Sequence, residues 1–142
     1  MMLLLYEILL AATVCDYLWY KIPNRLIYIG IVAGYLYKLI MYSPGEALYS
    51  LLSGISVTLG LSVLYIVRAL GAGDIKLLGL VGVFVGFSGT VKICLISLIV
   101  GAFAGFVILI YFGFIQKNHS KKSHYIRFSI PILISVFIFE FV

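Results

Sequence analysis

Charged residues are scarce in this sequence. Only 11% of its 142 residues are Asp, Glu, Lys or Arg, whereas 64% are hydrophobic. An ordinary soluble domain has about a quarter of its residues charged. A chain of this length forms one domain at most, and a soluble fold could not bury so much apolar surface. The composition therefore excludes a soluble domain and predicts a single-domain, all-α integral membrane protein.

Paired cysteines are also missing. The two cysteines, Cys15 and Cys94, are isolated in apolar stretches, and no Cys-x-x-Cys pair exists. Neither a disulfide framework nor a zinc knuckle is indicated. We therefore expect both thiols to be buried and inert, and we expect no metal and no other cofactor.

A secretory signal is not indicated at the start of the chain. Residues 1–15 lack the basic residues with which a signal peptide begins, and they carry Glu7 instead. We therefore expect this apolar stretch to be retained as a membrane span. No soluble domain is expected before or after the spans.

Six apolar stretches approach the length of a membrane span, which is about 20 residues. Pro23 suits the start of the second stretch, because the first turn of a helix does not need its missing N–H. The turn signal Ser43-Pro44-Gly45 precedes the third. The predicted spans are residues 2–20, 23–41, 47–67, 74–91, 93–116 and 125–142.

The basic residues between these spans are unevenly divided. Connectors on the cytoplasmic side are enriched in Lys and Arg. The connectors after spans one, three and five, with the adjoining span ends, hold eight basic residues, and the opposite side of the membrane holds two. We therefore predict six spans with both termini outside. The eight are Lys21, Arg25, Arg68, Lys76, Lys117, Lys121, Lys122 and Arg127, and the two are Lys38 and Lys92.

Aspartate occurs only twice, at Asp16 and Asp74. An ionisable side chain in an apolar span is costly, so its presence suggests a function. Asp16 falls at the inner end of the first predicted span and Asp74 at the inner start of the fourth. The predicted topology therefore brings both carboxylates to the cytoplasmic face. Glu7 and Glu140 fall in the outer halves of their spans, too far away to join them.

Two neighbouring carboxylates in a site of low dielectric cannot both ionise cheaply, so they share a proton. One can take a proton from water while the other donates one to a peptide carbonyl, as in aspartic proteases. The alternative reading is structural. Asp16 could cap the second helix or pair with Lys21, and Asp74 could pair with Lys76 or Arg68.

Two glycines precede the second aspartate in the segment Gly71-Ala72-Gly73-Asp74-Ile75-Lys76. Gly71 and Gly73 carry no side chain, which allows backbone or substrate to approach closely. A glycine-rich turn at a helix start is the alternative. Lys76 either tunes the aspartate pair or extends toward the membrane surface.

These segments resemble motifs of the type IV prepilin peptidases. Residues 71–77 are similar to the family's Gly-x-Gly-Asp-x-Lys-Leu signature, and residues 16–24 to its first motif, an aspartate before an Ile-Pro-Asn helix start. The segment Arg127-Phe128-Ser129-Ile130-Pro131 is similar to its last-span motif. In this resemblance Asp16 and Asp74 are the catalytic residues. The supporting residues are Gly71, Gly73, Lys76, Pro23 and Asn24.

The resemblance covers nearly the whole chain and implies a multi-pass aspartic endopeptidase of the cytoplasmic membrane. Such an enzyme removes the short basic leader of prepilin-like proteins on the cytoplasmic side. Its expected partners are prepilin or pseudopilin substrates and the lipid bilayer, with no nucleic acid. Longer members also methylate the new amino terminus and carry a region with paired cysteines. This chain resembles the short, peptidase-only form of tight-adherence (Flp) pilus systems.

Other functions remain open at this point. An archaeal preflagellin peptidase shares the Gly-x-Gly-Asp element and is the closest alternative. Presenilin-like and signal-peptide-peptidase-like proteases share this element too, but the Ile-Pro-Asn element and the short length of this chain argue against them. A small ion- or proton-coupled transporter would use intramembrane aspartates to carry ions. A non-catalytic assembly subunit would tolerate the loss of either aspartate.

The charge asymmetry makes a direct prediction about topology. Single cysteines introduced at Ser43 and at Ser120 should be labelled from opposite sides of the membrane, with Ser120 facing the cytoplasm. A membrane-impermeant thiol reagent applied to intact cells and to inverted vesicles measures this. Labelling of both positions from one side would contradict the six-span arrangement.

Overall fold

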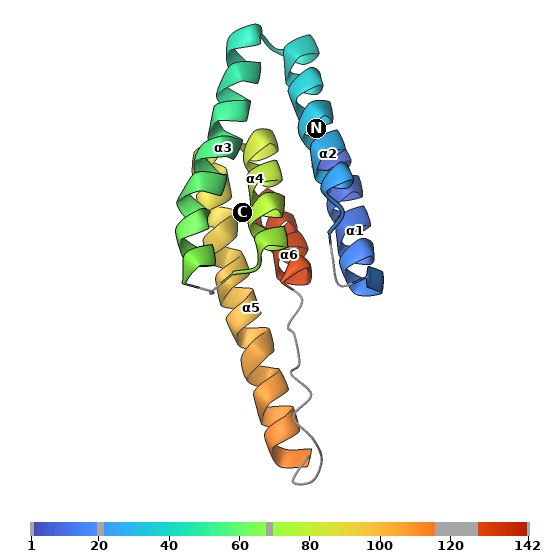
Figure 1. The fold of residues 1–142 in the computed structure, drawn as a ribbon, viewed down its shortest axis with the longest axis vertical. Helices are drawn as coiled ribbons and strands as arrows, with labels where there is room; N and C mark the ends of the chain where they lie inside the picture. Colours follow the sequence, from blue (N-terminus) through green and yellow to red (C-terminus); the bar gives the residue numbers. More distant parts are fainter. Residues whose placement is uncertain (1, 20–21, 68–69, 116–127, 142) are drawn as a thin grey trace.

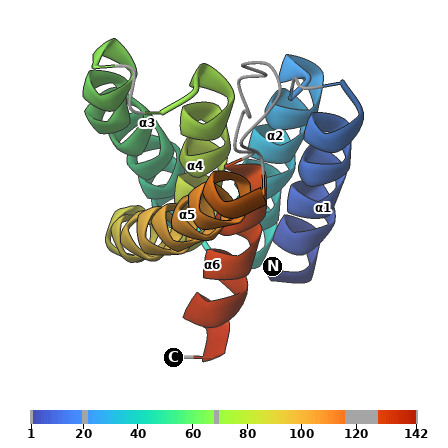
Figure 2. The same ribbon diagram turned by 90° about the horizontal axis from the view of Figure 1, so that it is seen from below.

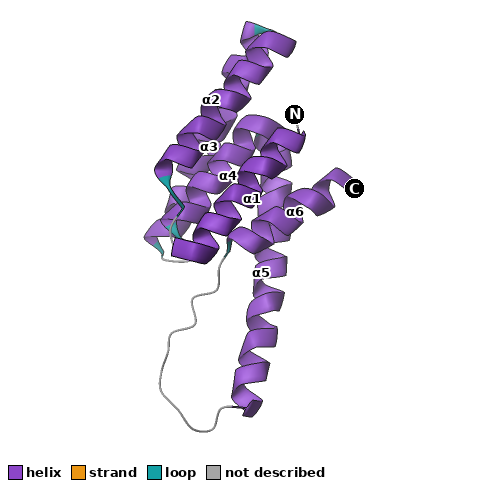
Figure 3. Ribbon diagram, turned by 90° about the vertical axis from the view of Figure 1, so that its right-hand side faces the viewer, coloured by secondary structure: helices purple, strands orange, loops and turns teal. Residues whose placement is uncertain are grey.

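The computed structural model describes residues 2–19, 22–67, 70–115 and 128–141. In these residues the chain forms six helices and no strands (Figures 1 and 3). This confirms the predicted all-α class. The helices are α1 (Met2–Trp19), α2 (Asn24–Met41), α3 (Pro44–Ile66), α4 (Ala72–Val85), α5 (Phe87–Ile115) and α6 (Ser129–Phe141).

Helix α4 is the centre of the bundle. Each of the other five helices contacts it, and the view from below shows it between α3 and α2 (Figure 2). Of its 14 residues nine are buried, Ile75 and the run from Leu77 to Phe84. A helix that is apolar on every side requires such enclosure. Its two charged side chains lie near its start, where Asp74 is partly exposed and Lys76 is exposed.

The end of α4 corrects the predicted spans. Residues 74–91 and 93–116 were expected to form the fourth and fifth spans, but α4 ends at Val85 and α5 begins at Phe87. The break is at Gly86, whose φ of 88° lies in the left-handed region that favours glycine. Lys92 consequently lies inside α5 and not in a connector.

The described helices differ in length from the six predicted spans. Within the part of the chain that the structure describes, three helical segments are long and apolar enough to cross a membrane: Met2–Trp19, Pro44–Ile66 and Phe87–Val107. Helix α4 measures about 21 Å at 1.5 Å per residue, less than the hydrocarbon core of about 30 Å. Helix α5, with 29 residues, continues well beyond the bundle (Figures 1 and 3).

Two other boundaries also differ from the prediction. Helix α3 begins three residues early, at Pro44, because the Ser43 side chain caps it by accepting a bond from the backbone N–H of Glu46 at 3.3 Å. Helix α6 begins at Ser129, so Pro131 lies in its first turn, where a proline requires no kink. The first residues of the predicted sixth span, 125–127, lie outside the described residues.

The outer surface of the bundle is strongly apolar. Leu3, Ile40 and Ile66 are each more than 70% exposed, and large hydrophobic side chains of all the longer helices are exposed as well. A soluble monomer rarely shows such extended apolar surface. The surface and the long apolar helices agree with a protein embedded in a lipid bilayer.

Glycines allow α3 and α4 to pack closely. A Cβ added to Gly54 would lie 2.6 Å from a methyl group of Val83 and 2.9 Å from the carbonyl oxygen of Gly79. Beside this contact the Ser53 hydroxyl donates a hydrogen bond to the carbonyl of Gly82 at 2.8 Å. The two backbones are therefore in contact, as expected where small residues line a helix interface.

This contact predicts that Gly54→Ala destabilises the protein by about 1–3 kcal/mol, because a backbone carbonyl cannot move aside as a side chain can. Gly60→Ala is the matched control. Gly60 lies on the same helix with no atom of another element within 4 Å of an added Cβ, so the change should be neutral or stabilise by up to about 1 kcal/mol. Thermal unfolding in detergent compares them. Equal losses of stability would show that the contact is loose.

Candidate active site

Asp74 is the third residue of α4, and its side chain turns back toward the start of the helix. The backbone N–H of Gly71 donates a hydrogen bond to its carboxylate. A carboxylate at this position that bonds the residue before the helix is half of a capping box. It also lies at the positive end of the helix dipole. The sequence therefore holds this carboxylate in place by local backbone geometry.

The two predicted glycines do not contribute equally. A Cβ on Gly71 would lie 2.9 Å from Oδ2 of Asp74, so a side chain there would displace the carboxylate. A Cβ on Gly73 would lie 3.4 Å from the Ile22 side chain, an ordinary van der Waals contact. The atom that comes close to Gly71 is thus the carboxylate of Asp74 itself, and the predicted approach of a substrate stays a prediction.

Asp16 lies in the last turn of α1 and is partly exposed. Its Oδ2 accepts a hydrogen bond of 2.6 Å from the hydroxyl of Ser129, the first residue of α6. Sequence reasoning assigned no role to Ser129, although it quoted the residue within the Phe-Ser-Ile-Pro segment. That segment was the signal that could have identified it.

The structure brings the two aspartates together. The end of α1 and the starts of α4 and α6 lie toward the same end of the bundle (Figure 1). The charge of Asp16 acts on the carboxyl of Asp74, and both side chains remain partly exposed. Two partly buried carboxylates that interact can exchange protons with water and with a substrate.

Two of the four structural alternatives for the aspartates are not observed, and the other two lie outside the described residues. The residue before α2 is Pro23, and no side chain caps that helix, so Asp16 does not cap it. Lys76 donates its Nζ hydrogen bond to Oδ1 of Asn24, at 2.9 Å, and not to Asp74. The other proposed partners, Lys21 and Arg68, lie outside the described residues.

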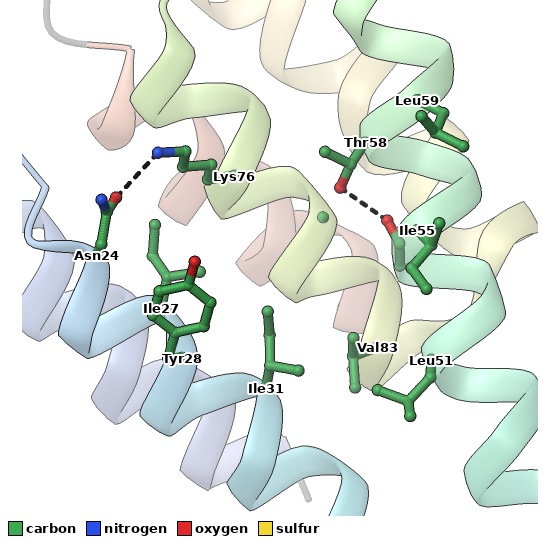
Figure 4. A pocket seen from close by; sticks show the side chains of 12 residues that line it. Asn24, Ile27, Tyr28, Ile31, Leu51, Ile55, Thr58, Leu59, Lys76 and Val83 are labelled. Carbon is green, nitrogen blue, oxygen red and sulfur yellow. Dashed lines mark hydrogen bonds between the residues drawn. The ribbon is translucent and has the colours of Figure 1, made fainter.

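Lys76, Asn24 and Pro23 belong to a separate part of the site. Lys76 follows Asp74 by two residues, which places it about 200° around the helix axis. Its bond to Asn24 joins the start of α2 to α4, at one end of a pocket of about 270 Å³ (Figure 4). The rest of the pocket is mainly apolar and is lined by Ile27, Tyr28, Ile31, Leu51, Gly54, Ile55, Thr58, Leu59, Gly79 and Val83.

The sequence predicted that both cysteines are buried and inert. Cys94 is buried as expected, whereas Cys15, next to Asp16, is only partly buried, and both are free thiols. Within the described part of the chain, no three His, Cys, Asp or Glu side chains are grouped so that they could hold a metal ion.

Comparison with known proteins gives the family. A model of the type IV leader peptidase family matches residues 3–112. The chain belongs to the type IV leader peptidase family. A search of curated proteins and a search of solved structures each returned no significant match. The match confirms the resemblance seen in the sequence and makes the protein a peptidase.

The region that matches the family model ends within α5, at residue 112. It contains α1 to α4 and most of α5, and so both Asp16 and Asp74. Helix α6 and Ser129 lie beyond it. The family match therefore covers Asp16 but not Ser129, and the contact between them is seen in the structure.

Proposed function

We propose that this member of the type IV leader peptidase family is an aspartic endopeptidase embedded in the cytoplasmic membrane. It removes the short basic leader of prepilin-like proteins on the cytoplasmic side. The observation that carries the proposal is the interaction of Asp16 with Asp74, the chain's only aspartates, at one end of a bundle of apolar helices.

The proposed reaction uses the two carboxylates as base and acid. One carboxylate accepts a proton from a water molecule, whose oxygen attacks the carbonyl carbon of the scissile peptide bond. The other, protonated, donates its proton to the carbonyl oxygen. Collapse of the tetrahedral intermediate breaks the C–N bond, a proton from the dyad passes to the departing amine, and the proton of one hydroxyl group of the intermediate returns to the dyad as the carbonyl re-forms. The partial exposure of both aspartates gives water a route to the site.

The neighbouring groups support these roles. The N–H of Gly71 bonds Asp74, and the open space at Gly71 leaves room for that carboxylate. The bond between Lys76 and Asn24 holds the start of α2 against α4. Lys76 is therefore proposed to support the arrangement of the helices without sharing in the proton transfer.

The orientation is part of the proposal. The excess of basic residues in three connectors supports six spans with both termini outside and the aspartates facing the cytoplasm. The short α4 fits this arrangement because it is enclosed by its neighbours and α5 follows it after one residue. The leader of a prepilin, being basic, remains on this side of the membrane.

The chain is further proposed to cleave without methylating. Among its residues only two cysteines occur, and they are not paired. The resemblance links methylation to a region with paired cysteines. An archaeal preflagellin-type peptidase remains the nearest alternative. The transporter class is disfavoured, because the match is to a family of peptidases.

The central prediction concerns the two aspartates. Asp16→Asn and Asp74→Asn should each lower cleavage of a co-expressed prepilin by at least about 10²-fold, because asparagine keeps the shape but cannot exchange a proton. Membrane abundance should stay near that of the wild type. Lys76→Ala should reduce cleavage less than Asp16→Asn or Asp74→Asn does. Electrophoretic mobility of the prepilin and immunoblotting of the enzyme measure both quantities.

Two outcomes would contradict this prediction. Near wild-type cleavage by either asparagine variant would show that the dyad is not the catalytic group. Loss of cleavage only in proportion to lost protein would show that the aspartates are structural, since removal of one partner of a buried pair destabilises a fold.

The absence of methylation has its own test. The mature substrate made by cells that express this chain should carry an unmodified amino terminus, as measured by intact-mass spectrometry. Cells that lack the chain provide the control. A methyl group that depends on this chain alone would contradict the assignment to the peptidase-only form.

A further inference from the structure

The hydroxyl of Ser129 makes a contact between distant parts of the chain. Ser129 is the first residue of α6 and is 1% exposed. It donates a hydrogen bond to Oδ2 of Asp16, 113 residues away, at 2.6 Å. A hydroxyl that donates to a carboxylate over such a short distance forms one of the stronger hydrogen bonds in proteins.

The other buried serines of the described residues behave differently. Each donates to a carbonyl three residues earlier in its own helix, as hydroxyls in helices commonly do. Ser53 donates to the carbonyl of Gly82 as well. These serines are Ser50, Ser53, Ser97 and Ser135. Among these buried serines, only Ser129 bonds a carboxylate.

The surroundings hold Ser129 firmly. Phe128, the residue before it, packs against α5, where a Cβ added to Gly101 would lie 2.7 Å from the phenyl ring. Pro131 in the first turn restricts the backbone dihedral there. The start of α6 is thus fixed against α5 and presents the hydroxyl to Asp16. By contrast, Asp16 lies in the last turn of its helix, followed by the exposed Leu18 and Trp19.

We infer that Ser129 is a positioning residue for Asp16, and that its hydrogen bond holds the carboxylate in the orientation that the cleavage reaction needs. This inference rests on the proposed function of Asp16. A carboxylate at a helix end can rotate about its side-chain bonds. Bonding Oδ2 fixes that rotation and directs Oδ1 toward the place of the water or the substrate. A small displacement of a reacting group is enough to slow a reaction strongly.

The test compares three variants as purified enzymes in detergent, with kcat expressed per mole of folded protein. Ser129→Ala should lower kcat by about 10- to 100-fold with little change in KM, because supporting contacts of this kind have effects of that size. Ser129→Thr keeps the hydroxyl and should recover most of the rate. Ser135→Ala is the matched control: Ser135 is on the same helix, equally buried, and bonds the carbonyl of Ile132.

A loss of activity caused by misfolding must be distinguished from a loss caused by the missing hydroxyl. Thermal unfolding is measured for each. If the added methyl group of Ser129→Thr prevents folding, Ser129→Cys replaces it, because a thiol is a weaker donor of similar size. Its kcat should fall between those of the wild type and Ser129→Ala.

The inference is overturned if Ser129→Ala keeps the wild-type kcat, or if Ser135→Ala loses as much kcat as Ser129→Ala. Asp16→Asn, assayed beside them, separates this failure from that of the proposed function. An active Asp16→Asn contradicts the catalytic role itself. An inactive Asp16→Asn beside a fully active Ser129→Ala contradicts the positioning role alone.

Discussion

The structure depends on the enclosure of one short helix. Helix α4 has apolar residues on all its faces, and nine of them are buried by the five surrounding helices. It is shorter than the hydrocarbon core, and its neighbours cover most of its length, whereas its first residue, Ala72, is exposed. The close packing of Gly54 against Gly79 and Val83 fixes α4 against α3. The position of Asp74 at its first turn follows from this packing.

Helices α1 and α6 contribute the other aspartate, Asp16, and its hydrogen-bond partner, Ser129. Polar contacts join this pair of helices near both of its ends. The bond between Ser129 and Asp16 lies at one end, and at the other the Tyr6 hydroxyl donates to the carboxylate of Glu140 at 2.5 Å. Because hydrogen bonds between apolar helices have few competitors in a membrane, such contacts set the relative position of the helices. The two catalytic candidates are thus carried by α1 and α4, which also contact each other.

The sequence predicted the features that depend on rare residues. Two aspartates in an apolar chain indicated the site, because few other residues there could exchange protons. The break at Gly86 could not be predicted, because the sequence does not distinguish a glycine that adopts a positive φ from a glycine that allows two helices to pack closely. The partner of Asp16 was also missed, because a serine shows its tertiary partner only after the helices are packed.

The two carboxylates are proposed to act as one catalytic unit. A double-mutant comparison tests this most directly, by measuring residual cleavage per folded molecule for Asp16→Asn, Asp74→Asn and both changes together. Groups that act in one step are strongly non-additive, so the double variant should retain as much activity as the less active single variant. Losses that multiply in the double variant would show that the two aspartates act independently, and would contradict the account.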